Sequence, residues 1–154
     1  MADGQGRRGE AVPPPPAGFE ASARGPYSTH NGPLFHKLNG DGTFEHAFYV
    51  LGRHCNGMGI VHGGMLSTFL DGLLARAVYT VAETSSVTMH LSIDFLSMAR
   101  AGEWVFGDAR VTRKTKDIAF AEGRIRVGER DILRGSGVFK LLNRKIEPGG
   151  LAAP

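Results

Sequence analysis

Between residues 63 and 82 the chain is apolar almost all the way round a helical wheel, and Asp71 and Arg76 are the only charges. A helix that is apolar on every side belongs inside a domain, so this pattern predicts one long buried helix. Because the two charges interrupt it, the segment favours a core helix over a membrane span, which needs roughly 18 or more unbroken apolar residues.

The helix is flanked by segments with the pattern of strands. From Val87 to Phe95 apolar and polar residues alternate, which is the period of a half-buried strand, and we expect the odd-numbered apolar side chains to share one face. Turn residues such as Asn39-Gly-Asp-Gly42 separate the further predicted strands. These lie at 43–51, 104–112, 118–127 and 132–142.

The order of these elements is one strand, the long helix and then four strands joined by short turns. It predicts an α+β fold in which an antiparallel sheet of about five strands wraps around one central helix. Such a sheet leaves its edges and part of one face uncovered, so pairing between subunits is expected.

The two ends of the chain differ from this middle part. Residues 1–25 are rich in Gly, Pro, Ala and Arg and lack apolar periodicity, so we expect a disordered leader there. Residues 146–154 have the same character and predict a flexible tail, which leaves 26–145 as a single domain. With one cysteine, no apolar secretory segment and no membrane span, the expected location is cytoplasmic.

Charge adds a hint about the ligand. The net charge is only +3, but residues 101–145 hold eleven Lys and Arg against six Asp and Glu. This excess indicates either an anionic ligand or a solvated outer face of the sheet. No basic run is interleaved with aromatics as nucleic-acid binding would favour, and no metal-ligand spacing is present.

Asp71 is the residue whose position most needs an explanation, because an acidic side chain inside an apolar helix is rarely kept without a partner or a task. One interpretation is a structural salt bridge with Arg76. Five residues at about 100° each place Arg76 roughly 140° away around the helix, so the two do not share a face. The second interpretation, a functional carboxylate, is the one we favour.

Gly63 and Gly64 open the helix, where backbone N–H groups lack intrahelical partners and the helix dipole is positive. Such a place can hold an oxyanion, although a glycine pair can also simply permit the turn. Eight residues along a helix separate Gly63 from Asp71 by about 12 Å. If both act on one carbonyl, the acid comes from a second copy of the helix, and the site lies between two subunits.

Three residues before the helix are weaker candidates. Asn56 and His62 can hydrogen-bond a substrate carbonyl or can only orient the loop. Cys55 stands beside His54. Adjacent residues of an extended loop point apart, so this pair does not predict cysteine catalysis.

The segment Asn56-Gly-Met-Gly-Ile-Val-His-Gly-Gly-Met-Leu-Ser-Thr-Phe-Leu-Asp71-Gly resembles the signature of hotdog-fold thioesterases of the phenylacetic-acid-degradation (PaaI) type. Flanking segments at 32–34 and 95–103 are also similar to that family. The resemblance implies the hotdog fold, dimers that pair into homotetramers, and hydrolysis of an acyl-CoA with an aromatic or medium-chain acyl group, without a cofactor.

The resemblance also implies roles for individual residues. The Gly63 N–H polarises the thioester carbonyl, and Asp71 of the partner chain attacks it or activates water. Asn56 and His62 position the thioester or the water, and Thr88 falls where related enzymes carry a hydroxyl near the water. Candidates for substrate binding are Gly64, Met58 and Met65 for the acyl part, and Arg100, Arg113, Lys114 and Lys116 for the CoA phosphates.

Two other functions stay open from the sequence. A hotdog dehydratase or hydratase needs a histidine and an acid that converge on the α and β carbons of its substrate, and the spacing to Asp71 favours hydrolysis instead. A protein that binds acyl-CoA without turning it over has no need of the intact acid.

Overall fold

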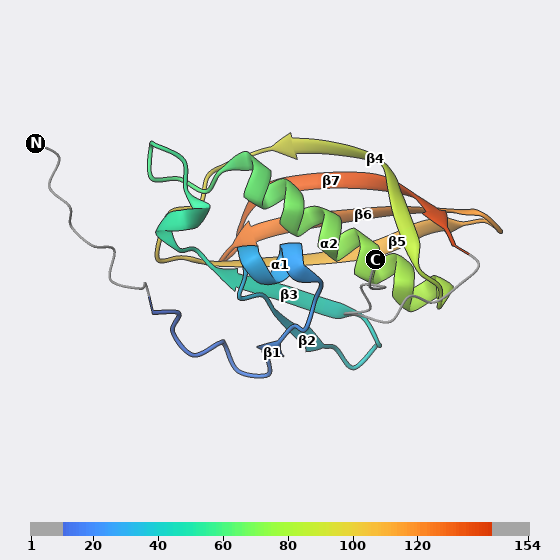
Figure 1. Ribbon diagram of the computed structural model, residues 1–154, viewed down its shortest axis with the longest axis horizontal. Coiled ribbons are helices and arrows are strands. Elements are labelled where there is room, and N and C mark those ends of the chain that lie inside the picture. The colour runs from blue at the N-terminus through green and yellow to red at the C-terminus, as the bar shows by residue number, and fades with distance from the viewer. Residues whose placement is uncertain (1–10, 143–154) are drawn as a thin grey trace, which may run out of the picture.

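The computed structural model describes residues 11–142 and shows one antiparallel sheet wrapped around a long helix (Figure 1). The neighbouring strands follow the order β1-β2-β3-β5-β6-β7-β4. In chain order the elements are β1 (Glu20–Ala21), α1 (Pro26–Asn31), β2 (Phe35–Leu38), β3 (Phe44–Tyr49), a 3-10 turn (Gly52–His54), α2 (Gly63–Ala82), β4 (Ser86–Phe95), β5 (Trp104–Lys114), β6 (Ile118–Val127) and β7 (Arg130–Leu141).

The predicted α+β class and central helix are confirmed, but the sheet has seven strands instead of about five. The two additional strands, β1 and β2, contain two and four residues. Segments this short cannot show an alternating pattern of apolar and polar residues. They are strands because their backbones pair with a neighbouring strand. β2 pairs with β3 from Phe35 opposite Ala47 to Leu38 opposite Phe44.

Part of the expected leader has a defined place in the fold. Glu20–Ala21 pairs with β2, and the Ser22 N–H donates to the Leu34 carbonyl over 2.8 Å. The expectation of disorder up to residue 25 is therefore wrong for this stretch, because hydrogen bonds to a sheet edge order a segment that buries little apolar surface. Residues 1–10 and the predicted tail lie outside the described residues.

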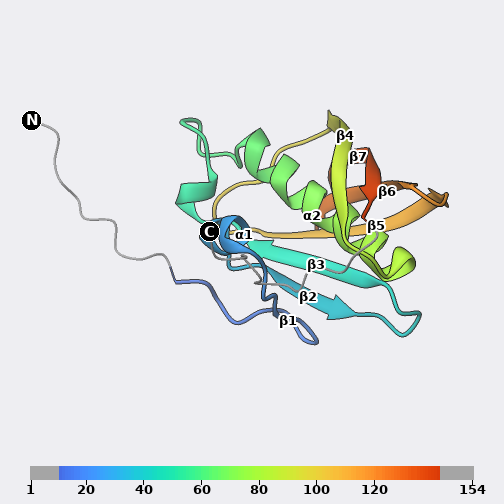
Figure 2. The ribbon, with the colours of Figure 1, turned by 45° about the vertical axis from the view of Figure 1, so that its right-hand side comes forward.

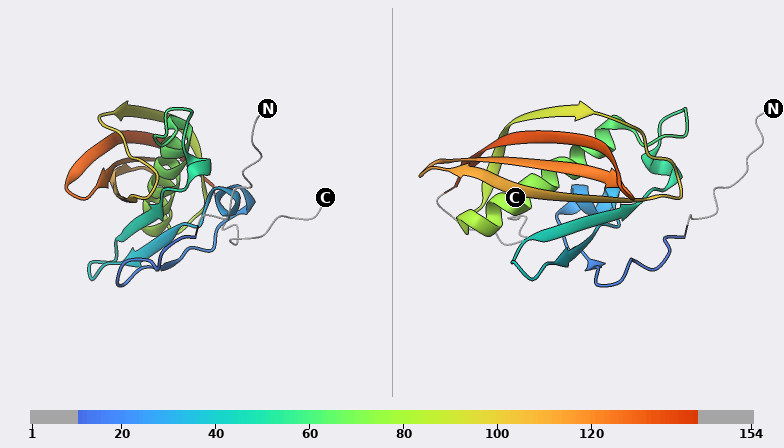
Figure 3. Two further views of the ribbon diagram at one scale, coloured as in Figure 1. Left: turned by 90° about the vertical axis from the view of Figure 1, so that its left-hand side faces the viewer. Right: turned by 180° about the vertical axis from the view of Figure 1, so that it is seen from behind.

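The sheet curves around α2. Figure 2 shows the helix between β3 on one side and β4 with β7 on the other, and the rear view in Figure 3 shows β5, β6 and β7 covering it. On the side that the sheet leaves open, Tyr27 of α1 hydrogen-bonds Thr68 of α2 over 3.2 Å. Although α2 is long and apolar enough to cross a membrane, seven of its residues are buried in the core against the sheet.

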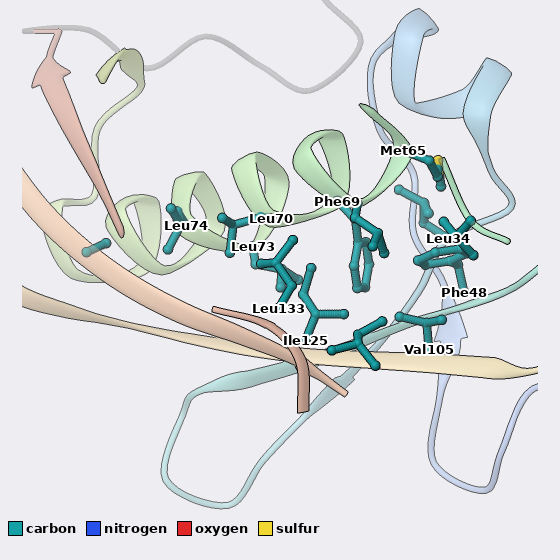
Figure 4. Close-up of a cluster of buried hydrophobic side chains, with 14 of the residues drawn as sticks. Leu34, Phe48, Met65, Phe69, Leu70, Leu73, Leu74, Val105, Ile125 and Leu133 are labelled. Carbon is teal, nitrogen blue, oxygen red and sulfur yellow. The ribbon is translucent and has the colours of Figure 1, made fainter. Parts of the chain in front are cut away.

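Leucine and phenylalanine side chains from α2 form the centre of the core against the strands (Figure 4). Glycines in the strands let the helix approach closely. A β-carbon added at Gly135 would lie 2.6 Å from the Leu70 Cδ2, and one at Gly137 would lie 3.0 Å from the Leu74 Cδ1. Larger residues there would push the helix away from the sheet.

β4 forms one edge of the sheet and does not keep the alternation that the sequence predicts. Its register against β7 shifts between Thr88 and His90, so Val87 and Met89 point outward and are 52% and 61% exposed. Thr88 points inward instead. The expectation of one apolar face along β4 is wrong, because a bulge adds a residue to the strand and reverses the side on which later residues lie.

Candidate functional site

The first turn of α2 presents one free backbone donor. His62 is the N-cap, and its Nδ1 accepts the Gly64 N–H over 2.8 Å. The Gly63 N–H has no hydrogen-bond partner among residues 11–142 and points out of the positive end of the helix. The predicted oxyanion donor is thus available at Gly63, whereas the donor at Gly64 is already used.

An aromatic ring packs beside Gly63. A β-carbon added at Gly63 would lie 3.3 Å from the Phe95 Cζ, so Phe95 at the end of β4 packs directly on the glycine. The ring is 55% exposed although it is large and apolar. Sequence reasoning did not single out Phe95 as a site residue, because only the return of β4 toward the start of α2 brings them together.

Asp71 and Thr88 form the second half of the site. The Thr88 hydroxyl donates to Asp71 Oδ1 over 2.7 Å, and no hydrogen bond involves Oδ2 among the described residues. The bulge in β4 turns Thr88 toward the helix. Arg76, which the sequence left as a possible salt-bridge partner, instead lies over the Phe44 ring at 4.3 Å. The carboxylate is thus held by a hydroxyl at Oδ1, and its Oδ2 has no hydrogen bond within the described part of the chain.

The two halves do not meet within one chain. Gly63 and Asp71 are both in the single straight helix α2, where eight residues span about 12 Å. Asp71 is only partly buried, and it faces the β4 edge of the sheet. A carbonyl in contact with one of them is out of reach of the other in the same subunit.

The loop before α2 is organised by Asn56. Its side-chain oxygen accepts the Met58 N–H over 2.9 Å and the Ile60 N–H over 3.4 Å, so this oxygen shapes the turn. Of the expected acyl contacts, Met58 is 75% exposed at the loop tip, whereas Met65 is buried in the core. Met58 is therefore available to a ligand, and Met65 serves packing.

The basic candidates lie at opposite ends of the molecule. Arg100 bridges to Ile60 beside the loop that precedes α2. Arg113 and Lys114 end β5, with Lys116 in the following turn, and all three are exposed. A single subunit cannot bring the four side chains to one ligand.

A cluster that sequence reasoning missed surrounds His46 on β3. His46 is 3% exposed and accepts a hydrogen bond from Arg24 Nη2 at Nδ1 over 2.8 Å. Burial, with Arg24, His36 and Arg76 nearby, lowers the pKa of His46 to about 3. The ring is neutral near pH 7. The sequence signal for such a buried histidine is its inward position in the predicted strand at 43–51.

This buried histidine predicts acid sensitivity. Unfolded His46 takes up a proton below its ordinary pKa of 6.5, whereas the folded protein takes it up only near 3. Stability is therefore full above pH 6.5 and falls by up to about 1.4 kcal/mol per pH unit as the pH drops toward 3. Urea unfolding at pH 7, 6 and 5 should show this slope, and it should flatten in His46→Gln.

The exposed His90 provides the matched control, because His90→Gln should leave the slope as in the natural protein. The same slope in His46→Gln and the natural protein would contradict the assignment.

Comparison with known proteins bears on what this arrangement does. The profile of the family described as the thioesterase superfamily matches residues 58–133, which include α2 and β4. A Pseudomonas aeruginosa protein named "Putative esterase PA0474" is 36% identical over 129 residues, covering 82% of this chain and 96% of that protein. Human acyl-coenzyme A thioesterase 13 is 31% identical over 69 residues, 44% of this chain and 49% of that protein.

Solved structures share the fold. Conserved protein PA5202 of Pseudomonas aeruginosa superimposes with a TM-score of 0.70 at 27% identity, over 76% of this chain and 94% of that one. The Bacillus halodurans protein BH2602, solved with CoA, superimposes with a TM-score of 0.65 at 23% identity, over 71% of this chain and 74% of that one. The PaaI protein of Escherichia coli superimposes with a TM-score of 0.61 at 22% identity, over 68% of this chain and 75% of that one.

The fold of these structures is the hotdog fold that the resemblance implied. The near full-length relative is named an esterase and the family profile is that of thioesterases, so both indicate a hydrolase, and the class of reaction is thioester hydrolysis. The chain therefore belongs to the thioesterase superfamily.

Proposed function

We propose that the protein hydrolyses acyl-CoA thioesters at sites shared by two subunits, with the Gly63 N–H from one and Asp71 from the other. One observation carries this proposal: an N–H at the start of α2 that has no partner in the described part of the chain and a carboxylate held by Thr88 lie on the same helix, too far apart to act together. Two copies of the helix side by side and antiparallel would solve this.

The β4 edge supports such a dimer. β4 ends the sheet there with ten residues and has no partner strand on its outer edge among residues 11–142, and Val87 and Met89 are exposed along it. An open apolar edge of this length favours pairing with another strand. If two β4 strands pair about a two-fold axis, the two sheets become one and the α2 helices run antiparallel, so Gly63 of each approaches Asp71 of the other.

The same symmetry would unite the basic residues. In an antiparallel pair, the end with Arg100 in one subunit lies beside the end with Arg113 and Lys114 in its partner. Lys116 joins them there. The four residues could then bind the phosphates of a single CoA. The arginines would donate paired hydrogen bonds to phosphate oxygens, and the lysines would act as point charges. The bound CoA of BH2602 is in keeping with this ligand class.

In this site the thioester carbonyl oxygen accepts the Gly63 N–H, which stabilises the negative charge as the carbon becomes tetrahedral. Asp71 either attacks that carbon or removes a proton from an attacking water, and the Thr88 hydroxyl fixes the orientation of the Asp71 carboxylate. The carbon–sulfur bond then breaks and CoA leaves as the thiolate. Water supplies the oxygen and the protons, so the products are the free acid and CoA.

The surroundings of Gly63 and the loop before α2 support a proposal for the acyl group of the substrate. Phe95, which packs on Gly63, and Met58, in the loop before α2, are both large, apolar and exposed, which favours an aromatic or medium-chain acyl group. We further propose a cytoplasmic homotetramer formed by two such dimers, a state to be measured by light scattering.

The test is a panel of acyl-CoAs from acetyl to dodecanoyl, with phenylacetyl and benzoyl, assayed for release of the CoA thiol. We expect turnover with a preference for aromatic or medium-chain substrates. If the protein binds acyl-CoA but releases no thiol from any substrate, it is an acyl-CoA binding protein and not an enzyme. Loss of water from a hydroxyacyl-CoA would point to the dehydratase.

A further inference from the structure

A second set of charged groups lies on the opposite side of α2 from Asp71. Arg24, from the segment after β1, and Arg76, from α2, lie close to each other beside β3. Among residues 11–142 neither forms a salt bridge. Burial and then the charge of Arg76 lower the pKa of Arg24, as expected for two guanidinium groups without an anion between them.

Arg76 is arranged to receive an anion. Its guanidinium lies over the Phe44 ring at 4.3 Å, which orients the group but uses its face and not its edge. The N–H donors of a stacked guanidinium remain in its plane, in the fork geometry that a carboxylate accepts. The nearby Thr80 hydroxyl donates its proton to the backbone carbonyl of Arg76 over 2.9 Å. That proton is already in use, so the donors for an anion come from the Arg76 guanidinium.

A cavity of about 200 Å³ opens beside this group, between α2 and the strands β3 and β5. Its polar rim includes Arg76, His46 and Arg110, and Arg110 is already paired with Glu122. Its apolar wall comes from both the helix and β5. The residues of that wall are Leu73, Ala77, Val81, Ala109 and Val111.

The size and lining limit the ligand. Drug-sized ligands occupy pockets of roughly 300 Å³ or more, so this cavity suits a smaller molecule and cannot hold a whole acyl-CoA. The charge at the rim selects an anion, and the wall selects an apolar body. We propose that this cavity, named the Arg76 pocket, binds a small apolar monocarboxylate with its carboxylate on Arg76.

The pocket is separate from the proposed catalytic site. Arg76 lies roughly 140° around the helix from Asp71, and it faces β3 whereas Asp71 faces β4. The acid released by thioester hydrolysis belongs to the ligand class of the pocket. That link to the reaction product rests on the proposed function, whereas binding of the carboxylate does not.

Isothermal titration of the full chain with hexanoate and benzoate tests the proposal, with hexanamide and benzamide as neutral controls. We expect saturable binding of the acids and none of the amides. Arg76→Gln should weaken binding at least about tenfold, since it removes a charge-assisted pair of hydrogen bonds. Arg134→Gln, an exposed arginine on the other face of the sheet, should change nothing.

NMR locates the ligand whether or not a variant is stable. Hexanoate should shift the resonances of Thr80, Ala109 and Val111, and Asp71→Asn should bind it as the natural protein does. The proposal is overturned if Arg76→Gln binds hexanoate with unchanged affinity, if the amides bind equally well, or if the shifts gather at Gly63. If the protein releases CoA thiol but does not bind hexanoate, the Arg76 pocket is excluded and the proposed function stands. If it binds hexanoate but releases no thiol, the proposed function is excluded and the pocket stands.

Discussion

Asp71→Asn should lower kcat/KM for thiol release by about 10²–10⁴-fold, the range that a positioned base or nucleophile contributes. Asparagine has nearly the same shape, and its carbonyl oxygen can still accept the Thr88 hydroxyl. The substitution removes the charge and the basic oxygen while the packing of α2 remains. KM and the thermal midpoint should therefore change little, which steady-state kinetics and calorimetry measure on the same sample.

Two control variants sharpen this test. Asp94→Asn removes an exposed acid of β4 that pairs with Arg134, and it should leave turnover unchanged. Thr88→Val keeps the shape but removes the hydroxyl that orients Asp71, so we expect a smaller loss than in Asp71→Asn. Full activity of Asp71→Asn would exclude Asp71 from the reaction.

Mixing two inactive variants should restore about a quarter of the natural activity. In a dimer of one Asp71→Asn chain and one Gly63→Pro chain, one site has both natural residues and the other has neither. Random exchange makes about half of the dimers mixed, and each mixed dimer has one working site of two. Thiol release after a cycle of mild denaturation and refolding measures the gain.

Gly63→Pro suits this experiment because it removes the donor with little effect on the helix. Gly63 is the first helical residue, where proline is tolerated, and His62 before it already has an extended backbone at φ −62° and ψ 136°. Phe95 must shift its exposed ring to make room. If subunit exchange is proven by mass spectrometry and no activity returns, the shared site is excluded.

The long elements of the fold were predictable from sequence because their pattern is local. α2 begins at Gly63 and ends at Ala82, as its apolar character predicts, and each longer strand overlaps a predicted segment, although β5 continues to Lys114 and β7 begins at Arg130. β1 and β2 were missed because strands of two and four residues are defined by their neighbours. The bulge at Thr88 was missed because alternation in the sequence continues through it.

Of the candidate site, the sequence determined the chemical groups: a glycine N–H at a helix start, an acid in its middle, and a separation along the helix axis that one carbonyl cannot bridge. Such properties depend on neighbours within a few turns. Only the tertiary structure decided that Thr88 reaches Asp71, that Phe95 covers Gly63 and that Arg24 lies beside Arg76. These contacts join residues distant along the chain, and the curvature of the sheet around α2 creates them.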